Sequence, residues 1–148
     1  MWRRLELANF LRAPLRGKLL AVEAAWQLLR ARIDTARPAS HYTPLFGRQD
    51  HDAPAPSEEQ EILAERIGAI VARAALWMPF RAQCLQQVLA MRRMLDRRGV
   101  PATVYLGVEH GQADAARGRR AHAWVRTGNR IVNGNIELDR YAVVGVYS

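Results

Sequence analysis

A β-hairpin is predicted by residues 121–133, whose sequence is AHAWVRTGNRIVN. Apolar and polar residues alternate over 121–127 and again over 130–133, and a period of two is the pattern of a half-buried strand. The pair Gly128-Asn129 between the two runs is typical of a tight two-residue turn. This stretch therefore predicts two antiparallel neighbours in a sheet.

Helices are expected in the part of the chain that precedes this hairpin. Apolar residues recur at helical spacing over 15–33 and 83–98, and a shorter helix is predicted over 2–11. Residues 57–60, Ser-Glu-Glu-Gln, form a capping box that opens another helix. That helix should end near Trp77, because a proline follows shortly after it.

Two further strands are expected around the hairpin. The period of two recurs at 103–108 and at 141–147, while residues 111–120 read as a polar loop rich in Gly and Ala. Helices followed by an antiparallel meander indicate an α+β fold. We expect an N-terminal helical region with a Pro-rich connection over 1–56 and a core over 57–148, together one compact unit.

Composition restricts the classes of function. The chain of 148 residues is 49% hydrophobic and 24% charged, which suits one globular domain. Its net charge of +8 fits an anionic partner, but no nucleic-acid-binding motif is present. No signal peptide and no apolar run long enough to span a membrane is found, so a cytoplasmic location is expected. The single cysteine excludes an internal disulfide, and the histidines lack metal-ligand spacing, so no metal or other cofactor is expected.

Cys84 stands at the start of the helix expected over 83–98. Unpaired backbone N–H groups and the positive end of the helix dipole meet there, and both stabilise a thiolate. The N–H of Cys84 and the side chain of Gln83 are candidates to hold an oxyanion. A lone cysteine is also a common small apolar residue of a core, so the helix pattern alone leaves both interpretations open.

His122 lies inside the first strand of the hairpin. Alternation places it on one face with Trp124 and Arg126, and a half-buried histidine needs a hydrogen-bonding partner. A backbone carbonyl would make it structural. A thiolate together with an orienting amide or carboxylate would make it a general base.

The register of the hairpin suggests which residue orients the ring. With a two-residue turn, the facing pairs are Thr127 with Arg130, Val125 with Val132, Trp124 with Asn133, and His122 with Asn135. Asn135 is therefore the predicted third member of the site, and Asn133 is the alternative. A change of one residue in the loop would bring Gly134 there instead.

Four short motifs follow one another in the second half of the chain: Cys84-Leu85, Arg97-Arg98-Gly99-Val100-Pro101-Ala102, Leu106-Gly107-Val108 and His122-Ala123-Trp124-Val125. In this order, over roughly residues 80 to 143, they resemble the leader peptidases of lasso-peptide biosynthesis, whose core is a reduced transglutaminase-like or papain-like fold. The N-terminal helices resemble the stand-alone form, in which leader recognition is a separate chain.

The resemblance implies a Cys-His-acid hydrolase that removes the leader from a precursor peptide. Carried over, Cys84 matches the nucleophile and His122 the base. The family usually has Asp as the third member, where this sequence has Asn-Gly-Asn at 133–135, and Asn serves this role in papain-like enzymes. The implied partners are the precursor, a separate leader-recognition protein and a macrolactam synthetase.

Two other functions stay open at this point. The same core can transfer an acyl group to an amine, as transglutaminases do, because the acyl-enzyme is shared and only the acceptor differs. A basic binding module, in which Cys84 and His122 are inert parts of the core, belongs to a different class.

Overall fold

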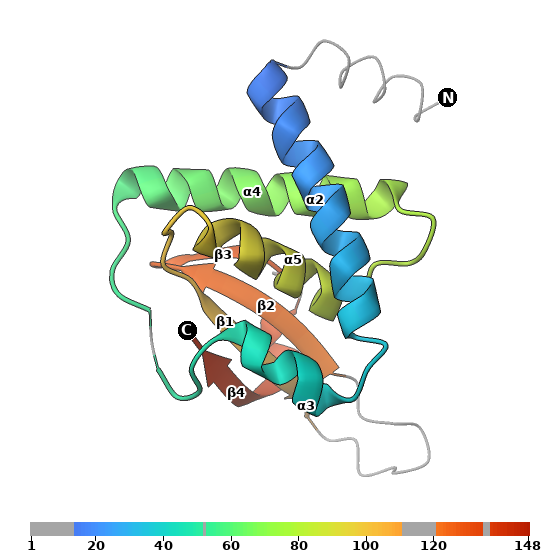
Figure 1. Ribbon diagram of the computed structural model, residues 1–148. Coiled ribbons are helices and arrows are strands. Elements are labelled where there is room, and N and C mark those ends of the chain that lie inside the picture. Colours follow the sequence, from blue (N-terminus) through green and yellow to red (C-terminus); the bar gives the residue numbers. More distant parts are fainter. Residues whose placement is uncertain (1–13, 52, 111–120, 135–136) are drawn as a thin grey trace.

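Helices precede an antiparallel sheet in the computed structural model, which describes residues 14–51, 53–110, 121–134 and 137–148 (Figure 1). The helical elements in chain order are α2 (Leu15–Asp34), α3 (Ala39–Tyr42), the 3₁₀ helix η1 (Thr43–Phe46), α4 (Glu58–Trp77) and α5 (Cys84–Asp96). The strands are β1 (Thr103–Glu109), β2 (Ala121–Thr127), β3 (Arg130–Asn133) and β4 (Tyr141–Tyr147), with the 3₁₀ helix η3 (Leu138–Arg140) before β4. The α+β class predicted from the sequence is confirmed.

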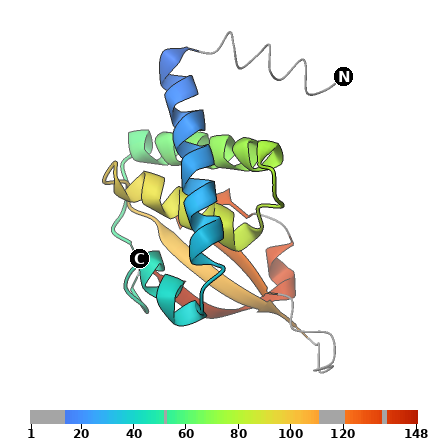
Figure 2. The same cartoon turned by 45° about the vertical axis from the view of Figure 1, so that its right-hand side comes forward.

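The described elements form layers. α5 packs on β2 and α4 packs on β3, while α2 packs across the outer side of both helices. Figure 2 shows α2 running over α4 and α5, with the sheet behind them. Although α2 and α4 have 20 residues each, no described helix is apolar enough along its length to cross a membrane.

Several predicted boundaries are confirmed. β2 and β3 have the predicted ends, and α5 begins one residue later than expected, at Cys84 itself. The capping box of α4 is formed, because Ser57 Oγ accepts the N–H of Gln60 at 3.2 Å and Gln60 Oε1 accepts the N–H of Ser57 at 2.9 Å. The predicted helix over 2–11 and loop over 111–120 lie outside the described residues, and the division of the chain after residue 56 stays a prediction.

The connection between α2 and α4 is more structured than the sequence suggested. It contains α3 and η1, and the ring of Phe46 is fully buried, with its centroid 5.6 Å from that of Tyr147. Arg48 and Ser148 exchange two backbone hydrogen bonds, at 2.7 and 3.0 Å. The connection therefore wraps the surface and ties the C-terminal residues of the chain to the core.

The sheet has the strand order β3-β2-β1-β4, with all described pairs antiparallel. Next to the turn Thr127 pairs with Arg130, as predicted. The register then shifts, and Val125 pairs with Asn133. The predicted pairs Val125 with Val132 and Trp124 with Asn133 are therefore wrong. Val132 is an extra residue on β3, which is the definition of a β-bulge, and a period of two cannot anticipate it.

Candidate active site

A pocket of about 1070 Å³ lies between the start of α5, the middle of α4 and the β2–β3 pair. Cys84 and His122, the two residues predicted to carry out chemistry, both line it, as do Gln83 and Asn133. The structure thus brings these four predicted site residues together on one surface. Asn135, the predicted third member, lies outside the described residues.

The start of α5 fixes the position of the cysteine. Cys84 is the first residue of the helix, so its backbone N–H has no acceptor within the helix. The N–H of Gln83 donates to Gln86 Oε1 at 3.0 Å, and Gln87 Nε2 donates to the carbonyl of Ala82 at 3.0 Å, which anchors the first turn. The thiol is free and partly buried, and no hydrogen bond to it is found in the described part of the chain.

The imidazole of His122 has a backbone partner. Its Nε2 lies 2.7 Å from the carbonyl oxygen of Gly134. A carbonyl can only accept, so Nε2 must carry the hydrogen and Nδ1 of the neutral ring keeps its lone pair. The contact therefore selects the tautomer in which Nδ1 is available to take a proton.

The bulge in β3 brings this carbonyl to the ring. Gly134 follows the shifted pair Val125–Asn133 and has a φ of +80°, a left-handed value that favours glycine. A Cβ at this position would lie 2.6 Å from the carbonyl oxygen of Ala123 and 2.8 Å from Cβ of Trp124. Only glycine fits here without displacing the backbone.

Asn133 is the alternative orienting residue predicted from the sequence. Asn133 is buried and lines the pocket, but it has no hydrogen bond with His122 in the described structure. The carboxylate of Glu137, two residues beyond Asn135, accepts a hydrogen bond from Arg140 at 2.6 Å. Among the described residues the backbone carbonyl of Gly134 therefore holds the ring.

Two aromatic rings flank the imidazole. The centroid of the Trp124 ring lies 5.9 Å from that of His122 along β2, and the Tyr141 ring lies 5.1 Å away from the start of β4. Tyr141 reaches His122 across β1 because residue 107 is glycine, where a Cβ would lie 3.0 Å from Cβ of Tyr141 and 2.9 Å from the Trp124 ring. Tyr141 was not predicted from the sequence, and the one signal for it was Gly107, since a glycine within a strand often marks a close approach.

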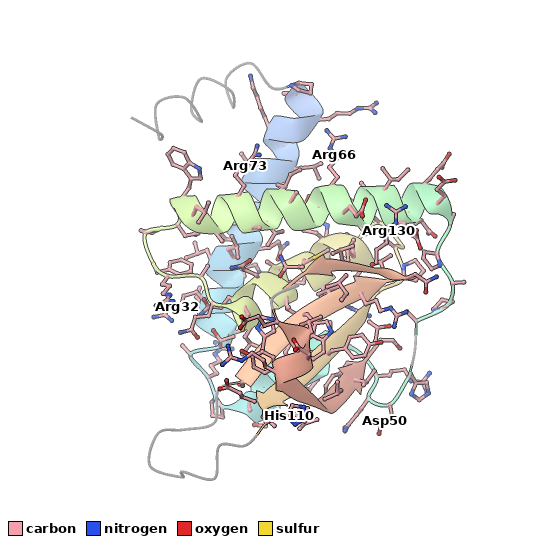
Figure 3. All side chains as sticks on the ribbon, turned by 180° about the vertical axis from the view of Figure 1, so that it is seen from behind. Arg32, Asp50, Arg66, Arg73, His110 and Arg130 are labelled. Atoms are coloured by element: carbon pink, nitrogen blue, oxygen red, sulfur yellow. The ribbon has the colours of Figure 1, made fainter. Side chains whose placement is uncertain are left out.

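Charged groups lie at the edge of the pocket. Glu65 of α4 lines it and accepts a hydrogen bond from Arg130 at 2.8 Å, and Figure 3 shows Arg130 beside α4. This hydrogen bond, with the nearby charges of Glu65 and Glu61, raises the pKa of Arg130 above its ordinary value. Arg81, just before α5, is exposed and also lines the pocket. No group of three or more His, Cys, Asp or Glu among the described residues is arranged to hold a metal ion.

Comparison with known proteins gives one match. The family model described as transglutaminase-like superfamily matches residues 22–146, which is most of the chain. No curated protein and no solved structure shows a significant similarity.

Proposed function

The chain belongs to the transglutaminase-like superfamily, and from that premise we propose that it is a cysteine peptidase that removes the leader from a lasso-peptide precursor before macrolactam formation. The observation that carries the proposal is the shared pocket of Cys84 and His122, with the ring held through Nε2 by the Gly134 carbonyl. The lasso-peptide substrate rests on the ordered sequence motifs.

In the proposed reaction Cys84 is the nucleophile. Its sulfur attacks the carbonyl carbon of the scissile bond while the thiol proton moves to Nδ1 of His122. His122 then gives this proton to the leaving amine, the C–N bond breaks, and the acyl group remains on sulfur as a thioester. Water next attacks the thioester and loses a proton to His122, which returns it to the departing sulfur.

The start of α5 suits the charge that develops on the carbonyl oxygen. The N–H of Cys84 has no acceptor within the helix, so it can donate to an oxyanion, and the Gln83 side chain at the pocket wall is a second donor. Hydrogen bonds between nucleophile and base commonly shorten only when substrate is bound, so a free thiol is compatible with this role.

Acyl transfer and hydrolysis share the thioester, so the acceptor distinguishes them. The superfamily match suits either reaction. Mass spectrometry of the products separates the two: hydrolysis leaves a free carboxylate on the leader, whereas transfer leaves an amide that contains an added amine.

We also propose that partners govern the rate. Binding energy from remote parts of a substrate positions the scissile bond, so a separate protein that binds the leader can raise the rate as well as the affinity. The purified chain should cleave its precursor slowly, and much faster with a separate leader-recognition protein, at fixed salt because surface charge makes weak binding salt-sensitive. The freed amine is then the substrate of the macrolactam synthetase. Full-speed cleavage by the chain alone would refute partner dependence.

The main test is cleavage of the precursor by wild type, Cys84→Ala and His122→Asn, with thermal unfolding as the control for folding. Loss of cleavage in both variants at unchanged melting temperature supports the proposal, and a thiol reagent should inactivate only proteins that keep Cys84. Retained cleavage in Cys84→Ala would overturn it. An absence of cleavage by wild type, with and without the partner, would favour the basic binding module.

A second test concerns the group that orients His122. Asn135 is the side chain predicted from the sequence, and the carbonyl of Gly134 is the other candidate acceptor of the Nε2–H. A loss of rate on the order of a hundredfold in Asn135→Ala, but not in Asn133→Ala, would favour the side chain. Wild-type rates in both variants would leave the orienting role to the carbonyl.

A further inference from the structure

The face of α2 that points away from the core carries a continuous apolar stripe. These side chains are between 40% and 71% exposed, and they are Leu15, Leu19, Val22, Trp26, Leu29 and Ile33. The opposite face buries Ala24, Gln27, Leu28 and Ala31 against the rest of the protein. α2 therefore has two apolar faces, and only one of them packs against the part of the chain that the structure describes. We call the exposed one the outer stripe.

The spacing of the outer stripe is that of a coiled-coil seam. Its members are four and three residues apart in strict alternation, which corresponds to the a and d positions of a heptad. At about 100° per residue they occupy an arc of roughly 80°, over a length of about 27 Å. A stripe this narrow matches the seam between two helices, whereas a helix face that inserts into a membrane surface or a core is wider.

The flanks of the outer stripe are basic. The cations beside it, at the e and g positions, are Arg16, Lys18, Arg30 and Arg32. Glu23, the one acid in the helix before its last turn, already binds Arg98 at 2.6 Å and Arg97 at 3.5 Å. Figure 3 shows Arg66 and Arg73 on the side of α4 toward which the N-terminal part of α2 projects. These two arginines add positive charge near α2. Charges at e and g positions select the partner of a coiled coil, so this seam favours an acidic helix.

We propose that the outer stripe of α2 binds an amphipathic helix of a partner protein that has apolar residues at heptad a and d positions and acidic residues on both flanks. A second copy of this chain fits less well. In an antiparallel pair centred on the stripe, e positions face e positions and g positions face g positions, so Arg16 would face Arg30 of the other copy and Lys18 would face Arg32. This inference goes beyond the proposed peptidase activity and does not depend on it.

The test uses two synthetic helical peptides of three heptads with Leu at a and d, one with Glu at all e and g positions and one with Lys. Fluorescence anisotropy measures their binding to the full chain. We expect binding of the Glu peptide alone, weakened at high salt. Trp26→Asp should weaken it at least tenfold, while Val144→Asp, an equally exposed apolar position on β4, should leave it unchanged. Arg16→Glu combined with Arg30→Glu should reverse the preference between the peptides.

Several outcomes would overturn the proposal. These are equal binding of both peptides, no binding of either, or the same affinity in Trp26→Asp as in wild type. Dimerisation in sedimentation velocity that Trp26→Asp abolishes would identify a second copy as the occupant instead. Binding to vesicles of phosphatidylcholine and phosphatidylglycerol, without preference for the Glu peptide, would identify a membrane. Circular dichroism establishes that each variant is folded, and alkylation of Cys84 reports the catalytic pocket separately.

Discussion

Replacement of Gly134 by alanine should detach the imidazole of His122 from its acceptor. Gly134 has a φ of +80°, and its carbonyl oxygen lies 2.7 Å from Nε2 of His122. An alanine Cβ would come within 2.6 Å of the Ala123 carbonyl oxygen and 2.8 Å of Trp124 Cβ. Since these neighbours belong to the backbone of β2 or lie next to it, the bulge must move, and the carbonyl moves with it.

The loss of stability in Gly134→Ala has two parts, the cost of a left-handed backbone and the cost of the Cβ contact. A second glycine, Gly99, separates them. Gly99 has a similar φ of +62°, but a Cβ there would meet nothing within 4 Å. Gly99→Ala should therefore show the left-handed penalty alone, about 1–2 kcal/mol of unfolding free energy, at full activity. Gly134→Ala adds the backbone contact. It should be more destabilising than Gly99→Ala and should also lower the cleavage rate, by about a hundredfold for a displacement near 1 Å.

Two measurements test the effect of Gly134→Ala, one on the tautomer of the His122 ring and one on the cleavage rate. Nitrogen-15 NMR of the His122 side chain reports which ring nitrogen carries the hydrogen, and we expect Nε2–H in wild type and in Gly99→Ala, but a mixture of tautomers in Gly134→Ala. Precursor cleavage measured on the same proteins gives the rate. Wild-type tautomer and rate in Gly134→Ala would refute the orienting role of this carbonyl. An equal loss of rate in Gly99→Ala would attribute the effect to general destabilisation.

Three further substitutions test other parts of the structure. Gly107→Ala should lower stability by about 1–3 kcal/mol through overpacking and should displace Tyr141 from the imidazole, seen as changed ring chemical shifts with a reduced rate. Gly68→Ala would place a Cβ 2.0 Å from a backbone carbonyl of β3, so its melting temperature should fall markedly. The hydrogen bond from Arg98 lowers the pKa of Glu23, so the ionised carboxylate stabilises the folded state above the ordinary value of 4.5 and this stabilisation is lost as the pH falls through the lower folded value. Glu23→Gln should therefore be less stable than wild type by about 1–2 kcal/mol at neutral pH, and the difference should shrink in acid denaturation series below pH 4.5.

The elements that could be predicted from the sequence are those set by local chemistry. The capping box at Ser57 fixes the start of α4, because both partners lie within four residues of each other. The Gly128-Asn129 turn fixes the inner ends of β2 and β3 in the same way. The placement of Cys84 at a helix N-terminus followed from the helix pattern alone.

The features that could not be predicted depend on contacts between distant segments or on backbone irregularity. Tyr141 comes close to His122 because β4 lies beside β1 and β1 lies beside β2. A local sequence pattern predicts the strands but does not predict their order in the sheet. The bulge at Val132 moves the partner of Val125 from Val132 to Asn133. The regular register predicted a side chain as the acceptor for His122, where the structure has the carbonyl of Gly134.

The bulge also bears on the Asn-Gly-Asn sequence at 133–135, where the leader peptidases that this sequence resembles usually have Asp. A side-chain acceptor is needed there only if the imidazole has no other partner, and the carbonyl of Gly134 already accepts its Nε2–H. A carbonyl fixes the tautomer and orientation as a carboxylate does, but it adds no charge to the pocket. Its position is set by backbone geometry, so the site should tolerate Asn in place of Asp while being intolerant of any side chain at residue 134. Substitutions at Asn133 and Gly134 should therefore affect the reaction mainly through how far they move this one carbonyl.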